Sequence, residues 1–196
     1  MAALPALARY FQRMRSAFLA AALLLPLAAA AQPTIDEQTA GEVVFRISGG
    51  ISTGASYDGE RVLGPVVNLE EGEGGGWVGD IGGNPVDLEV SDERVTGAGV
   101  DLFVKREKSQ LVIRGSLFNR RLWLEVGAKK VSGRAGDCSI DLKWKSPGLY
   151  VGNIGCSRGT QTPQTARAEL RFAGTAVDPT PPLPQFALAI VSVLPL

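Results

Sequence analysis

Apolar and polar side chains alternate with a period of two along most of the chain after residue 42. The clearest runs are Val43-x-Phe45-x-Ile47, Val86-x-Leu88-x-Val90, Val100-x-Leu102-x-Val104 and Ile140-x-Leu142-x-Trp144. Successive side chains of a strand point to opposite faces of a sheet, so this alternation indicates half-buried strands. The 24 glycines further disfavour helices. The sequence therefore predicts an all-β fold in a single antiparallel domain.

The predicted strands recur in the same order in three units that begin at Phe45, Leu88 and Leu124, at spacings of 43 and 36 residues. Internal repetition at such spacings is typical of tandem supersecondary units. We therefore expect a barrel or twisted meander of nine to twelve short strands, built from three related units and closed or covered by a C-terminal strand. Closure would remove the exposed sheet edges. An open sheet and a trefoil-like arrangement are the alternatives.

Each unit contains a hairpin whose register follows from the apolar pattern. Folding the third hairpin about Pro147 brings Leu142 opposite Gly152 and all the large apolar groups onto one face. The same register places Cys138 opposite Cys156, which predicts a structural disulfide. A redox pair is the alternative, but the two cysteines lack the C-x-x-C spacing of redox motifs. The corresponding pairs in the first and second hairpins are Leu69 with Gly79 and Leu102 with Gly115.

The N-terminus has the composition of a secretory signal peptide. Arg9, Arg13 and Arg15 precede the apolar run Ala17–Ala31, and Met14 is an alternative start. The run of about 15 residues is short for a membrane helix, which needs roughly 20. We predict export to the periplasm or the cell exterior after cleavage near Ala31. The predicted organisation is a signal peptide (1–31), an N-terminal extension (32–41), the repeat-built β domain (42–175), a proline-rich linker (176–185) and an apolar C-terminal strand (186–196).

Two kinds of candidate contact residue lie on the outward face of the predicted strands. Carboxylate and amide side chains recur at equivalent positions and face each other across the hairpins, where they can bind a cation or sugar hydroxyls. A solvated face with cross-strand hydrogen bonds is the simpler interpretation of the same positions. These residues are Asn68, Asp80, Asp101, Ser116, Asp141 and Asn153. The second candidate is Trp123, which falls on the face opposite to its apolar neighbours Leu122 and Leu124.

The remaining aromatic and basic residues are given structural roles. Trp77, Trp144 and Tyr150 fall on the apolar face and are expected in the core. The basic residues Arg120-Arg121, with Lys129-Lys130 nearby, are interpreted as local turn residues.

The composition excludes several chemistries. The chain has no His, which excludes a Ser-His-Asp triad and a His-ligated zinc site, and its 2 Cys cannot form a Cys₄ site. Its formal net charge of 0 provides no overall field for nucleic acid. We predict a non-enzymatic binding or envelope-associated protein with no metal, no cofactor and no nucleic-acid partner. The sequence does not identify its ligand or partner, for which an envelope or cell-surface molecule is the candidate. The alternatives are a small-ligand carrier that uses a barrel interior and an outer-membrane β-barrel, although membrane strands need about nine to eleven residues.

Overall fold

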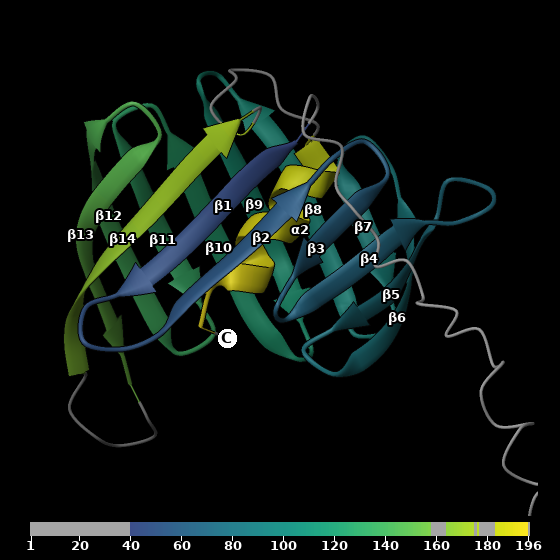
Figure 1. Cartoon of the computed structure of the whole chain (residues 1–196), viewed down its shortest axis with the longest axis horizontal. Coiled ribbons are helices and arrows are strands. Elements are labelled where there is room, and N and C mark those ends of the chain that lie inside the picture. The colour runs from purple at the N-terminus through teal and green to yellow at the C-terminus, as the bar shows by residue number, and fades with distance from the viewer. Residues whose placement is uncertain (1–39, 158–163, 175, 177–182, 196) are drawn as a thin grey trace, which may run out of the picture. The chain divides into compact units, whose positions relative to one another are not determined.

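The computed structural model describes residues 40–157, 164–174, 176 and 183–195. These residues form a closed antiparallel barrel of fourteen strands and one C-terminal helix, α2 (Leu183–Val193) (Figure 1). The all-β prediction and the single antiparallel domain are confirmed. The predicted signal peptide, residues 32–39 of the predicted extension and residues 177–182 of the predicted linker lie outside the described residues.

The strands follow one another around the barrel in chain order. They are β1 (Gly41–Ile47), β2 (Ser52–Tyr57), β3 (Arg61–Gly64), β4 (Val67–Glu71), β5 (Trp77–Ile81), β6 (Asn84–Val90), β7 (Arg94–Gly97), β8 (Val100–Glu107), β9 (Gln110–Leu117), β10 (Arg120–Gly127), β11 (Lys130–Ala135), β12 (Cys138–Ser146), β13 (Leu149–Cys156) and β14 (Gln164–Gly174).

Each strand pairs with its neighbour in the chain, and β1 pairs with β14 from Gly41↔Gly174 to Ile47↔Ala168, which closes the barrel. A closed barrel leaves no strand edge unpaired. The expected nine to twelve strands were too few. The short strand β3, for example, has the sequence RVLG, in which Val62 and Leu63 are adjacent, so it shows no period of two.

The predicted hairpin registers are confirmed. Leu69 pairs with Gly79, Leu102 with Gly115 and Leu142 with Gly152. A Cβ atom on any of the three glycines would lie 1.9–2.1 Å from a carbonyl oxygen of the partner strand. Each Leu therefore faces a position that accepts only glycine. The evolutionary or structural relation between the three predicted units remains a prediction.

The barrel interior is apolar. The inward-facing side chains of the strands include Leu69, Leu88, Leu102, Leu124, Leu142 and Leu170, all completely buried. Inside the barrel, α2 contacts β1, β2, β3 and β8 (Figure 1). Every residue from Phe186 to Leu194 is buried, as expected for a helix that is apolar on all sides. No helix in the described part of the chain is long and apolar enough to cross a membrane.

The expected C-terminal strand at 186–196 is wrong, because residues 186–193 belong to α2. A strand needs a free sheet edge for its backbone hydrogen bonds, and the closed barrel offers none. A helix satisfies these groups internally and can lie in the apolar interior. The helix also includes Leu183–Gln185, which were assigned to the linker. Pro184 lies in its first turn, where its missing N–H costs no helical hydrogen bond.

The aromatic residues predicted for the core divide into two groups. Trp77 and Tyr150 are buried, as predicted. Trp144, in contrast, is 50% exposed. It has the inward parity of β12 but lies near the end of the strand, next to a register irregularity between Trp144 and Ser146. At this end of the strand, alternation alone does not determine burial.

Candidate binding surface

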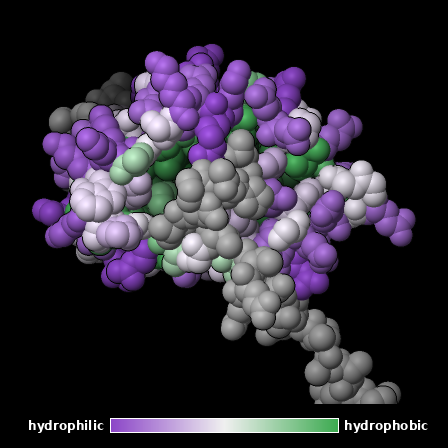
Figure 2. All heavy atoms as spheres, turned by 90° about the horizontal axis from the view of Figure 1, so that it is seen from above, coloured by the Kyte–Doolittle hydropathy of each residue, from purple (hydrophilic) through white to green (hydrophobic). Residues whose placement is uncertain are grey.

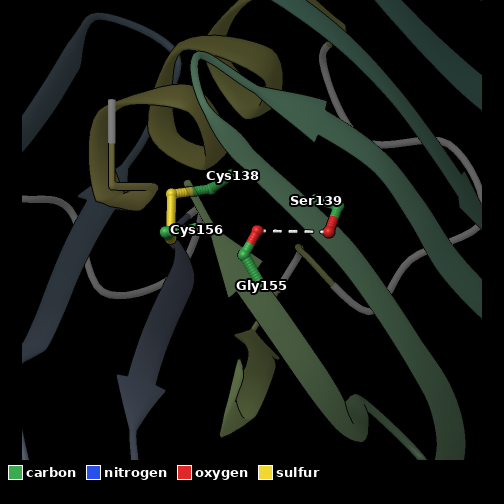
Figure 3. The surroundings of a disulfide bond; sticks show 4 residues. All are labelled: Cys138, Ser139, Gly155 and Cys156. Carbon is green, nitrogen blue, oxygen red and sulfur yellow. Dashed lines mark hydrogen bonds between the residues drawn. A yellow bond between two sulfur atoms is a disulfide. The ribbon is translucent and has the colours of Figure 1, made fainter. Parts of the chain in front are cut away.

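The two cysteines form a disulfide at the end of the β12–β13 hairpin (Figure 3). Cys138 and Cys156 are directly paired in the sheet, with their Cα atoms 4.0 Å apart. Beside them, Ser139 Oγ donates a hydrogen bond of 3.2 Å to the carbonyl oxygen of Gly155. The disulfide prediction is confirmed. The bond joins two directly paired strands, as expected for a structural disulfide.

The predicted polar pairs lie on the outer face of three separate hairpins. Asn68 pairs with Asp80, Asp101 with Ser116, and Asp141 with Asn153. The structure thus brings the two members of each pair together. The three pairs themselves belong to different hairpins, β4–β5, β8–β9 and β12–β13.

The three carboxylates of these pairs have partners within the protein. Asp101 Oδ1 accepts hydrogen bonds from Arg94, at 3.2 Å from Nε and 3.0 Å from a terminal nitrogen. Asp141 forms an ion pair of 3.3 Å with Lys130, and Asp80 accepts a hydrogen bond from the backbone N–H of Gly83. Within the described residues, no group of three or more metal-ligating side chains occurs. A ligand-binding role for the pairs remains a prediction.

Trp123 lies on the outer face of β10 and is 46% exposed. Its direct neighbours across the sheet are Arg114 on β9 and Arg134 on β11. Arg114 in turn pairs with Phe103 on β8, and Phe103 pairs with Arg94 on β7. Arginine and aromatic side chains therefore alternate across five adjacent strands. We call this row, Arg94, Phe103, Arg114, Trp123 and Arg134, the ladder.

A surface hollow of about 1040 Å³ lies beside the ladder. Its lining includes Trp123 and Arg134 of the ladder, with Arg120 and Arg121 of β10. Phe118 and Asn119 have φ angles of 48° and 66°, which form the tight turn between β9 and β10. The turn positions Arg120 and Arg121 at the start of β10, so these residues are close to a turn, as interpreted, and also line the hollow.

The arginines of this region are available to an external anion. Within the described part of the chain, Arg114, Arg120, Arg121 and Arg134 form no ion pair. The carboxylates that line the hollow are Asp101, held by Arg94, and Asp137. Guanidinium groups bind carboxylates and phosphates through two parallel hydrogen bonds. The hollow therefore combines anion-binding groups with an exposed aromatic surface.

Charges are segregated around the barrel. Residues 62–93 contain eight acidic and no basic residues, whereas residues 100–135 contain nine basic and three acidic residues. We call the outer face of β4–β6, with Glu70, Asp80, Asp87 and Glu89, the acidic side. The outer face of β8–β11 is the basic side. Sequence reasoning interpreted the basic residues as local turn residues and missed this segregation, which a count of charges by segment reveals.

Tyr150 is a buried ionisable group of the barrel. Burial raises the pKa of Tyr150, and its hydroxyl donates a hydrogen bond of 3.0 Å to the carbonyl oxygen of Gly127. This hydrogen bond links β13 to β10 within the barrel. The group is remote from the outer face and serves packing.

No family model, curated protein or solved structure matches the chain. A fold alone does not define a function, which depends on the site that it carries. The ladder, the hollow and the charge segregation are the features of this chain that point to a function.

Proposed function

We propose that the protein is an exported, non-enzymatic binding protein that contacts its partner through the outer face of β8–β11. The observation that carries this proposal is the ladder, in which the exposed aromatic residues Phe103 and Trp123 alternate with arginines. These side chains point away from the core, so the fold does not require them. Tryptophan and arginine, which the ladder contains, are among the residue types most enriched at binding hot spots.

The barrel interior gives less support to a small-ligand carrier. The side chains of α2 occupy the interior, and Phe186 contacts the rings of Tyr57 and Phe172 at centroid distances of 6.0 and 5.3 Å. A ligand of the interior would have to displace this helix. The outer face requires no such rearrangement.

The outer surface supports an aqueous environment for the barrel. Hydrophilic residues predominate on the face that Figure 2 shows, with hydrophobic residues visible between them. Outward positions along β8–β10 carry charges, such as Lys105, Arg114 and Glu125. An outer-membrane barrel needs an apolar outer band instead. The disulfide supports export, because disulfides persist in oxidising compartments.

Site-specific photo-crosslinking in the organism's own cells tests the binding face. A benzophenone amino acid replaces Trp123 on the basic side or, as a matched control, Val78 on the acidic side. The two residues are 46% and 45% exposed, so accessibility does not distinguish them. We expect a cross-linked adduct from position 123 and none from position 78. No adduct at position 123, or equal adducts at both positions, would contradict the proposal.

Export is tested by N-terminal sequencing of protein from the cell envelope and medium. The mature chain is expected to begin at Gln32, after cleavage at the Ala29-Ala30-Ala31 run. Full-length protein in the cytoplasm would refute export while leaving the binding face to the cross-linking experiment.

A further inference from the structure

The spacing of the ladder restricts the shape of a ligand that contacts all of it. Phe103 and Trp123 lie on β8 and β10, with Arg114 of β9 between them. Adjacent strands are about 4.8 Å apart, so the two aromatic residues are separated by about 9.6 Å along the row. One small ring cannot contact both. A ligand that contacts both aromatic residues must extend across the strands. It must also place a ring at every second strand.

The charges of the ladder restrict the chemistry of that ligand. Arg114 lies between the two aromatic residues and Arg134 lies beyond Trp123, so a cation alternates with each ring-binding position. Arg120 and Arg121 add further cations in the hollow. The whole chain has a formal net charge of 0, so this basic surface is a local concentration. The complementary ligand carries anionic groups repeated along its length.

The hollow also contains groups that accept hydrogen bonds. Asp101, Asn119 and Asp137 line it together with the arginines. Carboxylates accept hydrogen bonds from hydroxyl groups. Their like-charge repulsion acts on phosphates and sugar carboxylates alike, so the hydroxyl donors distinguish the two kinds of ligand. A DNA backbone has no hydroxyl donor within the chain and RNA has only the 2′-hydroxyl, whereas every ring of an acidic sugar chain has free hydroxyl groups.

We propose that the ladder and the adjacent hollow bind an acidic polysaccharide that runs across β8–β11. The sugar rings contact Phe103 and Trp123, whose separation is comparable to the length of a disaccharide in an extended chain. The sugar carboxylates bind Arg114 and Arg134, and the ring hydroxyls donate to Asp137 and to Oδ2 of Asp101, whose Oδ1 binds Arg94. This inference rests on the proposed function, since it identifies the ligand of the same face.

Binding of polygalacturonate to the purified mature protein, measured by isothermal titration calorimetry, tests the proposal. Methyl-esterified polygalacturonate is the matched ligand, because it has the same backbone without the negative charges. We expect the esterified polymer to bind at least about tenfold more weakly, and about 0.5 M salt to weaken the binding of the acidic polymer, since the Debye length is then only a few ångströms.

Two variants of the ladder and one control complete the experiment. Arg114→Gln and Trp123→Ala are each expected to lower the affinity about tenfold, as is common for hot-spot residues. Arg171→Gln changes an exposed arginine on β14, outside the ladder, and is expected to leave the affinity unchanged. Unchanged melting temperatures show that the variants fold.

Each other outcome overturns the polysaccharide assignment. Equal binding of the esterified polymer would show that charge is not used. Binding of oligo-dT in place of polygalacturonate, with the same loss in the variants, would identify a nucleic-acid surface. Self-association at low salt that Arg114→Gln abolishes would identify a second copy, bound through its acidic side. If polygalacturonate does not bind but position 123 still forms a cross-linked adduct in cells, the polysaccharide assignment alone is refuted. If position 123 forms no adduct in cells, the proposed function is refuted.

Discussion

The acidic and basic sides of the barrel have the same inner structure and opposite outer surfaces. On the acidic side, Leu69 is completely buried and faces Gly79. On the basic side, Leu102 is completely buried and faces Gly115 in the same way. The outward residues differ in charge although the two hairpins fold alike. The fold therefore constrains the inward positions, and the outward charges require another explanation.

The difference in outer charge gives the molecule one negatively charged side and one positively charged side. An anionic partner is attracted to β8–β11 and repelled by the carboxylates on β4–β6, although the total formal charge is 0. Complementary charge of this kind determines which face meets the partner and how fast the two associate, more than it adds affinity. The proposed orientation of binding would follow from the order of the strands.

Removal of the two buried leucines is expected to have the largest effect. Leu69→Ala and Leu102→Ala should each lower the free energy of unfolding by about 2–5 kcal/mol, because each leaves a cavity in the interior. The outward control Asn68→Ala should change it by less than about 0.5 kcal/mol. Urea denaturation monitored by circular dichroism measures all three. A marked difference between the two leucines would show that the inner structures of the two sides are not equivalent.

The similar inner structures of the two sides depend on local alternation, so they were predictable from the sequence. A shift of one residue would turn every inward side chain outward, so the apolar pattern determines the register of β4–β5 and β8–β9. The same logic identified Trp123 as outward-facing and paired Cys138 with Cys156. It did not identify α2, because the run Phe186–Val191 is apolar at every position and shows neither helical nor strand periodicity.

The ladder itself could not be predicted because it depends on the pairing of five strands. Arg94 and Arg134 are forty residues apart in the chain and reach the same row only through four successive registers. The individual hairpins were predicted, but their connection into one sheet depends on barrel closure. Trp123 therefore appeared as a single exposed aromatic residue, without its neighbours.

Substitution of the two glycines tests whether the inner structures are also equally strained. Gly79 and Gly115 have φ angles of 150° and 143°, and an added Cβ would lie 1.9 Å from a carbonyl oxygen in each case. Gly79→Ala and Gly115→Ala are expected to cost about 1–3 kcal/mol each, through strain and overpacking. Gly59 has no atom within 4 Å of its Cβ position, so Gly59→Ala is the control. Equal melting temperatures for all three variants would contradict the close approach of the strands.

The smallest expected effect concerns the exposed ion pair at the edge of the ladder. The side chains of Arg94 and Asp101 are 59% and 57% exposed, so water screens their attraction. Asp101→Ala should lower the free energy of unfolding by about 0.2–1 kcal/mol, and high salt should remove the difference.

Because Arg94 already binds the carboxylate, we expect Ca²⁺ to leave the melting temperature of the wild type unchanged. A Ca²⁺-dependent rise that Asp101→Ala abolishes would instead make this carboxylate a cation ligand, since a ligand that binds only the folded state stabilises it. The polar pairs would then be a second binding feature of the outer face, and the difference between the two sides would depend on the calcium concentration.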